Sequence, residues 1–249
     1  MSGHSKWATI KRKKAATDQA RGKLFSKYIK EITIAARHGG GDIEANPRLR
    51  TAVSAAKAVN MPAANIERAI KRGTGEIEGV SYEETQYEGY APGGVAVLVE
   101  VATDNRNRTA GDVRHIFTKH GGNLAEAGAV AYLFKLRGVI LVDKSAVSED
   151  ALIETVLDAG ADDVNAEGDS FEILTPPAQL EPVKAALAAK RVPVQSADVT
   201  KVASMQVPLD ESGAEAVLRL IDALEDHDDV QKVYSNFNVP DDILARLTR

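Results

Sequence analysis

The residues best suited to chemistry in this sequence are basic side chains near its start. The stretch from residue 6 to residue 30 contains a single acidic residue, Asp18. Its basic residues are Lys6, Lys11, Arg12, Lys13, Lys14, Arg21, Lys23, Lys27 and Lys30. Cations at this density repel one another unless a polyanion neutralises them, so the run predicts contact with nucleic-acid phosphates. Trp7 lies beside the run and would stack on an exposed base. The alternative is a solvated tail that Trp7 anchors to its own domain.

A second basic set is predicted on one face of a helix. Arg68, Lys71 and Arg72 are spaced i, i+3 and i+4, so a helix places them side by side as candidates for phosphate contact. Cations near the end of a helix are also favoured by the helix dipole, whatever the function. This set therefore has a purely structural alternative.

A third candidate set lies where a predicted strand ends and a helix begins, in the segment from Thr103 to Thr109. Asn105, Arg106 and Arg108 would donate there to phosphates or base edges, beside the unpaired N–H groups of the helix N-terminus. Equally, Asp104 or Asn105 would be only an N-cap, and the arginines would pair with acids of the acidic half of the chain. The residue types leave both interpretations open.

The net charge of −5 hides an uneven distribution. Residues 1–75 hold 16 Lys and Arg but only 5 Asp and Glu, a net charge of +11. Residues 76–249 hold the remaining 15 basic and 31 acidic groups, a net charge of −16. This asymmetry indicates that one end of the chain meets a polyanion while the rest stays soluble and repels non-specific contacts.

Several kinds of site are excluded or disfavoured. The chain has no cysteine, which excludes disulfides, thiolate zinc sites, iron–sulfur clusters and cysteine nucleophiles. It also lacks the phosphate-loop, dinucleotide, zinc-protease and serine-hydrolase motifs. One acidic cluster lacks the spacing of a calcium loop, so a solvated acidic face is favoured over a metal site; its residues are Asp222, Glu225, Asp226, Asp228 and Asp229. We expect a non-enzyme with no metal, no cofactor and no small-molecule substrate.

The longest apolar stretches are far shorter than the roughly 18 residues that span a bilayer. The basic start of the chain is not followed by an apolar run, so it does not resemble a secretory signal. These features predict no membrane partner and favour the cytoplasm.

The first half of the chain is predicted to be helical. Residues 1–17 are expected to form a basic arm and residues 18–78 a helical domain. The first helix ends at the glycines of residues 39–41, and Asn46 with Pro47 opens a second helix that Asn60 closes. Pro62 opens a third helix, with Gly73 just beyond its end.

The rest of the chain alternates strands and helices. Residues 134–205 read as strand, helix, strand, strand, helix, strand, which is the ferredoxin-like order. Residues 79–133 and 206–249 on either side supply a second α/β domain, whose hairpin is expected at 85–90 and 95–102. The predicted fold class is α+β, with a helical domain and two ferredoxin-like α/β domains, the third inserted in the second.

Several long motifs resemble the YebC family in order and over nearly the full length. They are Gly3 to Ala8, Gly39 to Arg50, Asn60 to Pro62, Asn65 to Gly75, Tyr87 to Gly94, Thr103 to Thr109 and His120 to Leu124. Thr9 and Ile43 stand where the family pattern has Asn and Pro, and neither change removes a charge. The resemblance implies an N-terminal helical domain, two α/β domains and a regulator of gene expression.

The resemblance implies two modes of action. Members are commonly described as DNA-binding transcriptional regulators, while similar mitochondrial proteins activate translation and bacterial relatives are linked to stalled ribosomes. The first mode predicts duplex DNA as the partner. The alternative is a ribosome-associated translation factor that places the same cations on ribosomal RNA or tRNA. A flexible basic arm with one aromatic side chain suits irregular RNA better than a groove.

Replacement of Lys11, Arg12, Lys13 and Lys14 by Ala is expected to weaken nucleic-acid binding. The plot of log K against log salt should become shallower by roughly 0.9 per lost phosphate contact on duplex DNA. Fluorescence anisotropy over a salt series measures both effects. An unchanged slope would place the phosphate contacts elsewhere in the chain.

Overall fold

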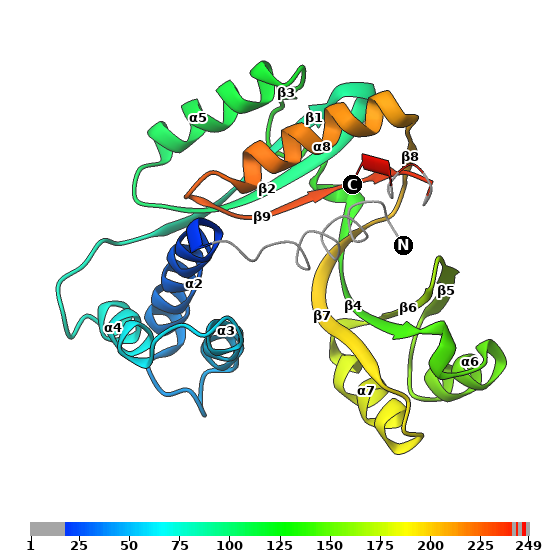
Figure 1. The fold of residues 1–249 in the computed structure, drawn as a ribbon. Coiled ribbons are helices and arrows are strands. Elements are labelled where there is room, and N and C mark those ends of the chain that lie inside the picture. Colours follow the sequence, from blue (N-terminus) through cyan, green and yellow to red (C-terminus); the bar gives the residue numbers. More distant parts are fainter. Residues whose placement is uncertain (1–17, 241–242, 244–245, 248–249) are drawn as a thin grey trace.

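The computed structural model describes residues 18–240, 243, 246 and 247, with side chains from residue 22 onwards except that of Glu167. Figure 1 shows three parts: three helices (the helical unit), a sheet covered by α5 and α8 (the central sheet unit), and a second sheet with α6 and α7 (the inserted sheet unit). The predicted α+β class, with an N-terminal helical region followed by antiparallel sheets, is confirmed. The predicted basic arm lies outside the described residues.

The helical unit consists of α2 (Asp18–Gly39), α3 (Pro47–Ala58) and α4 (Ala63–Thr74). Asn46 connects the end of α2 to the start of α3: its Oδ1 accepts the Leu49 N–H at 3.1 Å, and its Nδ2 donates to the Ala35 carbonyl at 2.8 Å. The side chain therefore caps one helix and positions the other. The core of this unit is built from its own apolar residues, with Ile32 and Leu49 at its centre.

The third helix ends two residues later than predicted. Gly73 lies inside α4, and Gly75 forms the left-handed C-cap with φ of +81°. The reason is packing, because a Cβ at Gly73 would lie 2.6 Å from the Ala36 Cβ and also collide with the Thr33 carbonyl oxygen. Gly73 therefore permits the close approach of α2 and α4, and the next glycine, Gly75, forms the C-cap.

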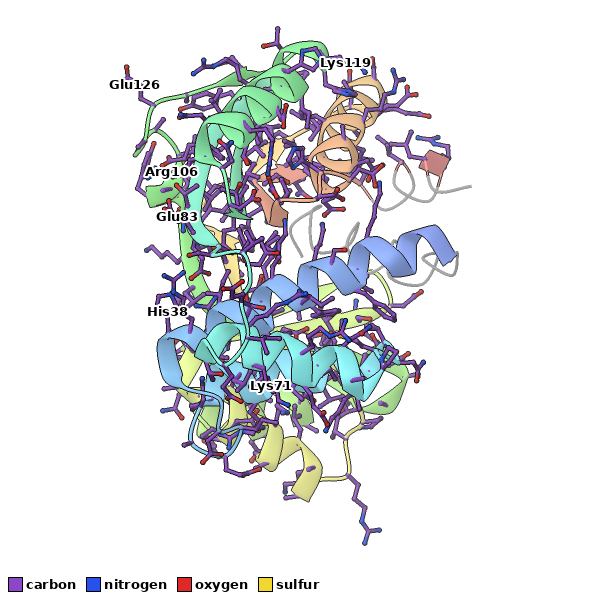
Figure 2. All side chains as sticks on the ribbon, turned by 90° about the vertical axis from the view of Figure 1, so that its left-hand side faces the viewer. His38, Lys71, Glu83, Arg106, Lys119 and Glu126 are labelled. Atoms are coloured by element: carbon purple, nitrogen blue, oxygen red, sulfur yellow. The ribbon has the colours of Figure 1, made fainter. Side chains whose placement is uncertain are left out.

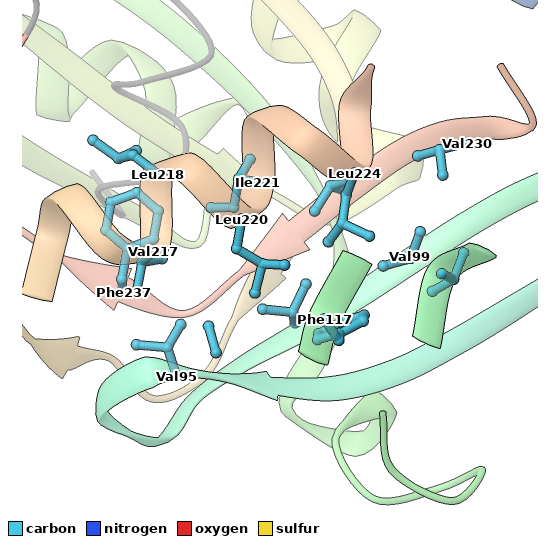
Figure 3. Packing of buried hydrophobic residues seen from close by; sticks show 14 of the residues in the cluster. Val95, Val99, Phe117, Val217, Leu218, Leu220, Ile221, Leu224, Val230 and Phe237 are labelled. Atoms are coloured by element: carbon cyan, nitrogen blue, oxygen red, sulfur yellow. The ribbon is translucent and has the colours of Figure 1, made fainter. Parts of the chain in front are cut away.

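The central sheet has the strand order β3-β1-β2-β9. Its strands are β1 (Glu83–Ala91), β2 (Val95–Thr103), β3 (Asn123–Leu124) and β9 (Val230–Ser235), and its helices are α5 (Arg106–Lys119) and α8 (Glu211–Glu225). Figure 3 shows Val95 and Val99 of β2 in one apolar cluster with Leu220 and Leu224 of α8. Two short strands, β8 (Val207–Pro208) and β10 (Phe237–Asn238), pair in parallel beside this sheet. Helices on one face of the sheet thus close an apolar core.

A buried carboxylate orders the segment before the inserted unit. Glu88 is 7% exposed, and its oxygens accept the N–H groups of Gly128, Val130 and Ala131 at 2.6–2.7 Å. Burial alone would raise the pKa of Glu88, but these three bonds outweigh it and hold the pKa below its usual range. Sequence reasoning did not identify this residue.

The inserted sheet unit leaves the central unit through β4 and returns through β7, which pair along their length. Its elements are β4 (Phe134–Asp143), α6 (Glu149–Asp158), β5 (Asp163–Glu167), β6 (Ser170–Thr175), α7 (Leu180–Ala189) and β7 (Val194–Ala203). The strand order β5-β6-β4-β7 is antiparallel throughout, as a ferredoxin-like βαββαβ order requires.

Replacement of Gly73 by Ala is expected to destabilise the helical unit by about 1 to 3 kcal/mol, because the added methyl group overpacks the α2–α4 contact. Gly111, inside α5, is the matched control: a Cβ there meets nothing within 4 Å. Gly111→Ala should raise stability by about 0.5 to 1 kcal/mol, because alanine loses less backbone entropy. Urea unfolding followed by circular dichroism measures the free energy of unfolding, which should fall for Gly73→Ala and rise for Gly111→Ala. Equal effects would contradict the packing explanation.

Candidate nucleic-acid interface

The basic set on α4 is presented to solvent. Arg68, Lys71 and Arg72 are all exposed, while Ile66 and Ala69 on the opposite side of the helix are buried. Figure 2 shows Lys71 of the helical unit and Arg106 of the central sheet unit on the same side of the molecule. Among the described residues, no ion pair engages the three α4 cations. Their charges therefore remain available to an external anion.

Two hollows lie beside this basic face, and Arg72 borders both. The smaller, of about 100 Å³, lies between α2 and α4 and is also lined by Asn65 and Arg68. The larger, of about 230 Å³, lies against the linker of residues 75–82 and is also lined by Arg37 and Tyr82. Both volumes are below the roughly 300 to 1,000 Å³ typical of pockets for drug-sized ligands. Their size suits single groups such as a phosphate or a sugar.

The linker positions the two arginines of the larger hollow. Arg37 Nη1 donates a hydrogen bond to Ser81 Oγ, and a Cβ at Gly79 would lie 3.0 Å from the Arg72 Cγ. The linker backbone therefore runs along the stem of Arg72. Burial raises the pKa of the Tyr82 phenol, and the nearby Arg72 charge acts in the opposite direction. Sequence reasoning missed Arg37, whose only local signal was a basic side chain in the last turn of a helix.

Two of the predicted phosphate ligands on α2 contact the end of α8. The Lys23 Nζ lies 3.2 Å from the Asp226 Oδ1, and the Lys27 Nζ donates to the Glu225 carbonyl at 2.7 Å. Both amines are therefore directed at the central sheet unit. Phosphate contact by these lysines remains a prediction. The basic arm, which contains Lys6, Trp7, Lys11, Arg12, Lys13 and Lys14, and the Arg21 side chain lie outside the described residues.

Asp229 lies at the centre of a buried polar network that joins α2 to the central sheet. Its Oδ1 accepts from the Lys30 Nζ at 2.6 Å. Its Oδ2 accepts from Thr109 Oγ1 at 2.7 Å, Arg108 Nη2 at 2.9 Å and Thr103 Oγ1 at 3.2 Å. Asp229 is only 4% exposed and Lys30 only 9%. The Lys30 ammonium is therefore enclosed in this structure.

Burial of Asp229 corrects one expectation from the sequence. The acidic cluster was predicted to be a solvated face, and for Asp229 this is wrong because the side chain is buried. Burial alone would raise its pKa, but the hydrogen bonds from Lys30, Arg108 and Thr109 outweigh that effect and hold the pKa well below its usual range. Among the described residues, no group of three or more acids and histidines is arranged to hold a metal ion.

The set at the start of α5 is largely occupied within the protein. The Asn105 Oδ1 accepts the Arg108 N–H at 3.1 Å, so Asn105 is the N-cap of α5. The Arg108 Nη2 also lies 2.7 Å from the Asp104 Oδ1, in addition to its contact with Asp229. These contacts fit the structural interpretation of Asn105 and Arg108. Arg106 is exposed beside them. Direct binding of nucleic acid by any of the three stays a prediction.

Comparison with known proteins gives the family. The sequence model of the TACO1/YebC protein N-terminal domain matches residues 5–76, and that of the TACO1/YebC second and third domain matches residues 82–237. The chain belongs to the TACO1/YebC family. The resemblance inferred from the sequence motifs is confirmed.

Relatives of this TACO1/YebC chain match over nearly their full lengths. A protein of Syntrophobacter fumaroxidans named "probable transcriptional regulatory protein" is 60% identical over 99% of this chain and 100% of its own. A protein of the same name from Dictyoglomus turgidum is 57% identical over 100% of both chains. The crystal structure of a conserved hypothetical protein from Aquifex aeolicus is 52% identical, has a TM-score of 0.77, and is matched over 91% of this chain and 94% of its own.

No helix in the described part of the chain combines the length and apolarity needed to cross a membrane.

Replacement of Asp229 by Asn is expected to destabilise the protein by about 1 to 3 kcal/mol, because buried donors lose their charged acceptor. Since the folded pKa lies below the unfolded one, the stabilisation is complete above about pH 4 and is lost as the pH falls toward the folded pKa. Urea unfolding of both proteins between pH 3 and pH 7 measures the difference.

The matched control is Asp226→Asn, because the Asp226 side chain is 73% exposed and its pair with Lys23 is solvated. Loss of this ion pair should lower the free energy of unfolding by less than about 1 kcal/mol. A stability difference for Asp229→Asn that persists undiminished at pH 3 would show that the negative charge is not the source of the stabilisation.

Proposed function

We propose that this chain is a DNA-binding transcriptional regulator that acts by binding and not by catalysis. The observation that carries the proposal is the exposed basic face of α4, formed by Arg68, Lys71 and Arg72, whose charges have no ion-pair partner among the described residues. The names of the family relatives support regulation of transcription as the process.

The chemistry of this face suits phosphate. Arg68 and Arg72 are one helical turn apart, so their guanidinium groups line the same ridge. Guanidinium groups bind phosphate oxygens through paired N–H donors, while Lys71 adds a point charge. The two hollows that Arg72 lines offer space for a phosphate or a sugar. The basic arm, predicted from sequence, would extend the same interaction.

Sequence specificity at this face is expected to be modest. Phosphate contacts position a protein on DNA, whereas base-edge contacts specify the sequence. On α4 the only amide side chain beside the cations is Asn65, which lines the smaller hollow. A helix that reads bases in the major groove presents several amide and arginine side chains along one face. We therefore propose a regulator for which DNA backbone and shape contribute most of the affinity.

The acidic remainder of the chain limits where DNA can bind. Residues 76–249 carry a net charge of −16 and would repel phosphate from both sheet units. Binding is thereby directed to the helical unit and the arm.

The triple variant Arg68→Ala, Lys71→Ala, Arg72→Ala tests the proposal. It should weaken binding to a duplex about ten-fold or more at moderate salt, and the slope of log K against log salt should fall by up to about 0.9 per lost contact. Fluorescence anisotropy with a labelled duplex measures both quantities.

The matched control is Arg114→Ala, Lys119→Ala, Lys190→Ala, which removes the same charge from exposed sites on the two sheet units. It should change neither affinity nor slope beyond a small long-range effect. Equal losses of affinity in the two variants would show that the effect depends only on net charge, and would contradict a binding site on α4. Parallel titrations with a promoter duplex and a ribosomal RNA fragment compare the two partners. A larger loss of affinity in the α4 variant for RNA than for DNA would favour the translational alternative.

A further inference from the structure

Three lysines follow one another on a single face of α2 and meet a single segment of the chain. Lys23, Lys27 and Lys30 are spaced i, i+4 and i+7, which places them in a row on the helix. The segment they meet is the C-terminal end of α8 and the turn that follows it, residues 225–229. We call this segment the α8 end.

The α8 end offers these lysines oxygen atoms that carry negative charge. The Lys23 ammonium meets the Asp226 carboxylate, and the ammonium groups of Lys27 and Lys30 meet carbonyl oxygens. The Lys30 Nζ lies 2.9 Å from the Asp228 carbonyl and 3.3 Å from that of Ala102, besides its pair with Asp229. Carbonyls at a helix C-terminus carry the negative end of the helix dipole. The α8 end thus resembles a row of phosphates in the groups it presents.

The contact is polar, while the apolar cores of the two units are separate. The core cluster around Ile32 contains only residues of the helical unit, and the cluster around Val99 contains only residues of the central sheet unit. One further ion pair joins the units: Arg48 Nη2 lies 2.6 Å from Glu84 Oε1, and both side chains are partly exposed. Glu84 is the second residue of β1, close to the linker of residues 75–82 that joins the units.

We propose that the lysine row of α2 is a second DNA-binding surface, which the α8 end covers in the absence of DNA. This inference rests on the proposed function. DNA phosphates displace the α8 end from Lys23, Lys27 and Lys30, and the helical unit turns about the glycine-containing linker. The exposed face of α4 makes the first contact, and the row on α2 extends it.

The physical chemistry of the contact fits such an exchange. A buried ion pair such as Lys30 with Asp229 gains attraction but loses hydration, so its separation into water returns hydration to both groups. The solvated pair of Lys23 with Asp226 contributes little to stability. In the exchange each ammonium group replaces a carboxylate or carbonyl oxygen of the α8 end by a phosphate oxygen. Asp229 retains Arg108, Thr103 and Thr109, so the central sheet unit keeps its own network.

A covalent lock tests the inference. The chain has no cysteine, so Lys23→Cys with Asp226→Cys places two unique thiols across the contact. A bis-maleimide linker with an internal disulfide joins them, and a reductant releases them. The locked protein should bind a labelled duplex at least ten-fold more weakly than the same protein after release. Equal affinities before and after release would overturn the inference.

A charge reversal provides a second measurement. Asp226→Lys repels the lysine row at an exposed position, and Asp158→Lys in the inserted sheet unit makes the same change of charge away from the contact. Asp226→Lys should tighten binding several-fold more than Asp158→Lys, with a steeper salt slope. It should also change the distance between labels on α3 and α6 in the absence of DNA.

Equal effects of the two reversals on affinity would overturn the inference, as would an unchanged distance between labels. If released, locked and unmodified proteins all failed to bind duplex DNA, the proposed function would fail as well. Binding that is strong but insensitive to the lock would refute the covered surface alone, and the α4 site would stand.

Discussion

A carboxylate cannot be buried without several donors around it, and the burial of Asp229 imposes that requirement on three distant segments of the chain. Lys30 comes from α2, Thr103 and Thr109 from the junction of β2 and α5, and the acid itself follows α8. Each donor must approach from its own direction, so in the absence of DNA the network holds α2 against the central sheet. Because α4 packs on α2 through Gly73, the exposed basic face on α4 is oriented by the same network.

The network also divides the basic side chains into two groups. Lys23, Lys27, Lys30 and Arg108 contact carboxylate or carbonyl oxygens within the protein, and these contacts remove them from solvent to different degrees. Arg68, Lys71 and Arg72 have no ion pair among the described residues and project into solvent. Charge density in the sequence therefore does not locate a binding surface, because only charges left uncompensated by the fold attract an external polyanion.

Local patterns predicted the elements well, and long-range packing accounts for what they missed. Asn46, Pro47 and Asn105 mark helix starts through capping chemistry that depends on neighbouring residues alone, and the structure places helices there. Gly73 was assigned as a helix end because its packing partner lies far away in sequence. The strands β3, β8 and β10 have two residues each, too few to show a period. Asp229 sits in an acidic run that looks solvated, and nothing local shows that Lys30 and Thr109 enclose it.

An acidic body beside a basic binding surface also bears on selectivity. A surface of free lysines would bind any polyanion, including short or sparsely charged ones, and would lose affinity only with rising salt. The lysine row of α2 must first leave the carbonyls and carboxylates of the α8 end. The binding free energy of a ligand is therefore only the difference between the lysine contacts that it makes and the contacts that it displaces. That difference is small for an isolated anion and grows with each consecutive phosphate. Discrimination then comes from competition within the protein, which penalises weak partners without requiring contacts to individual bases.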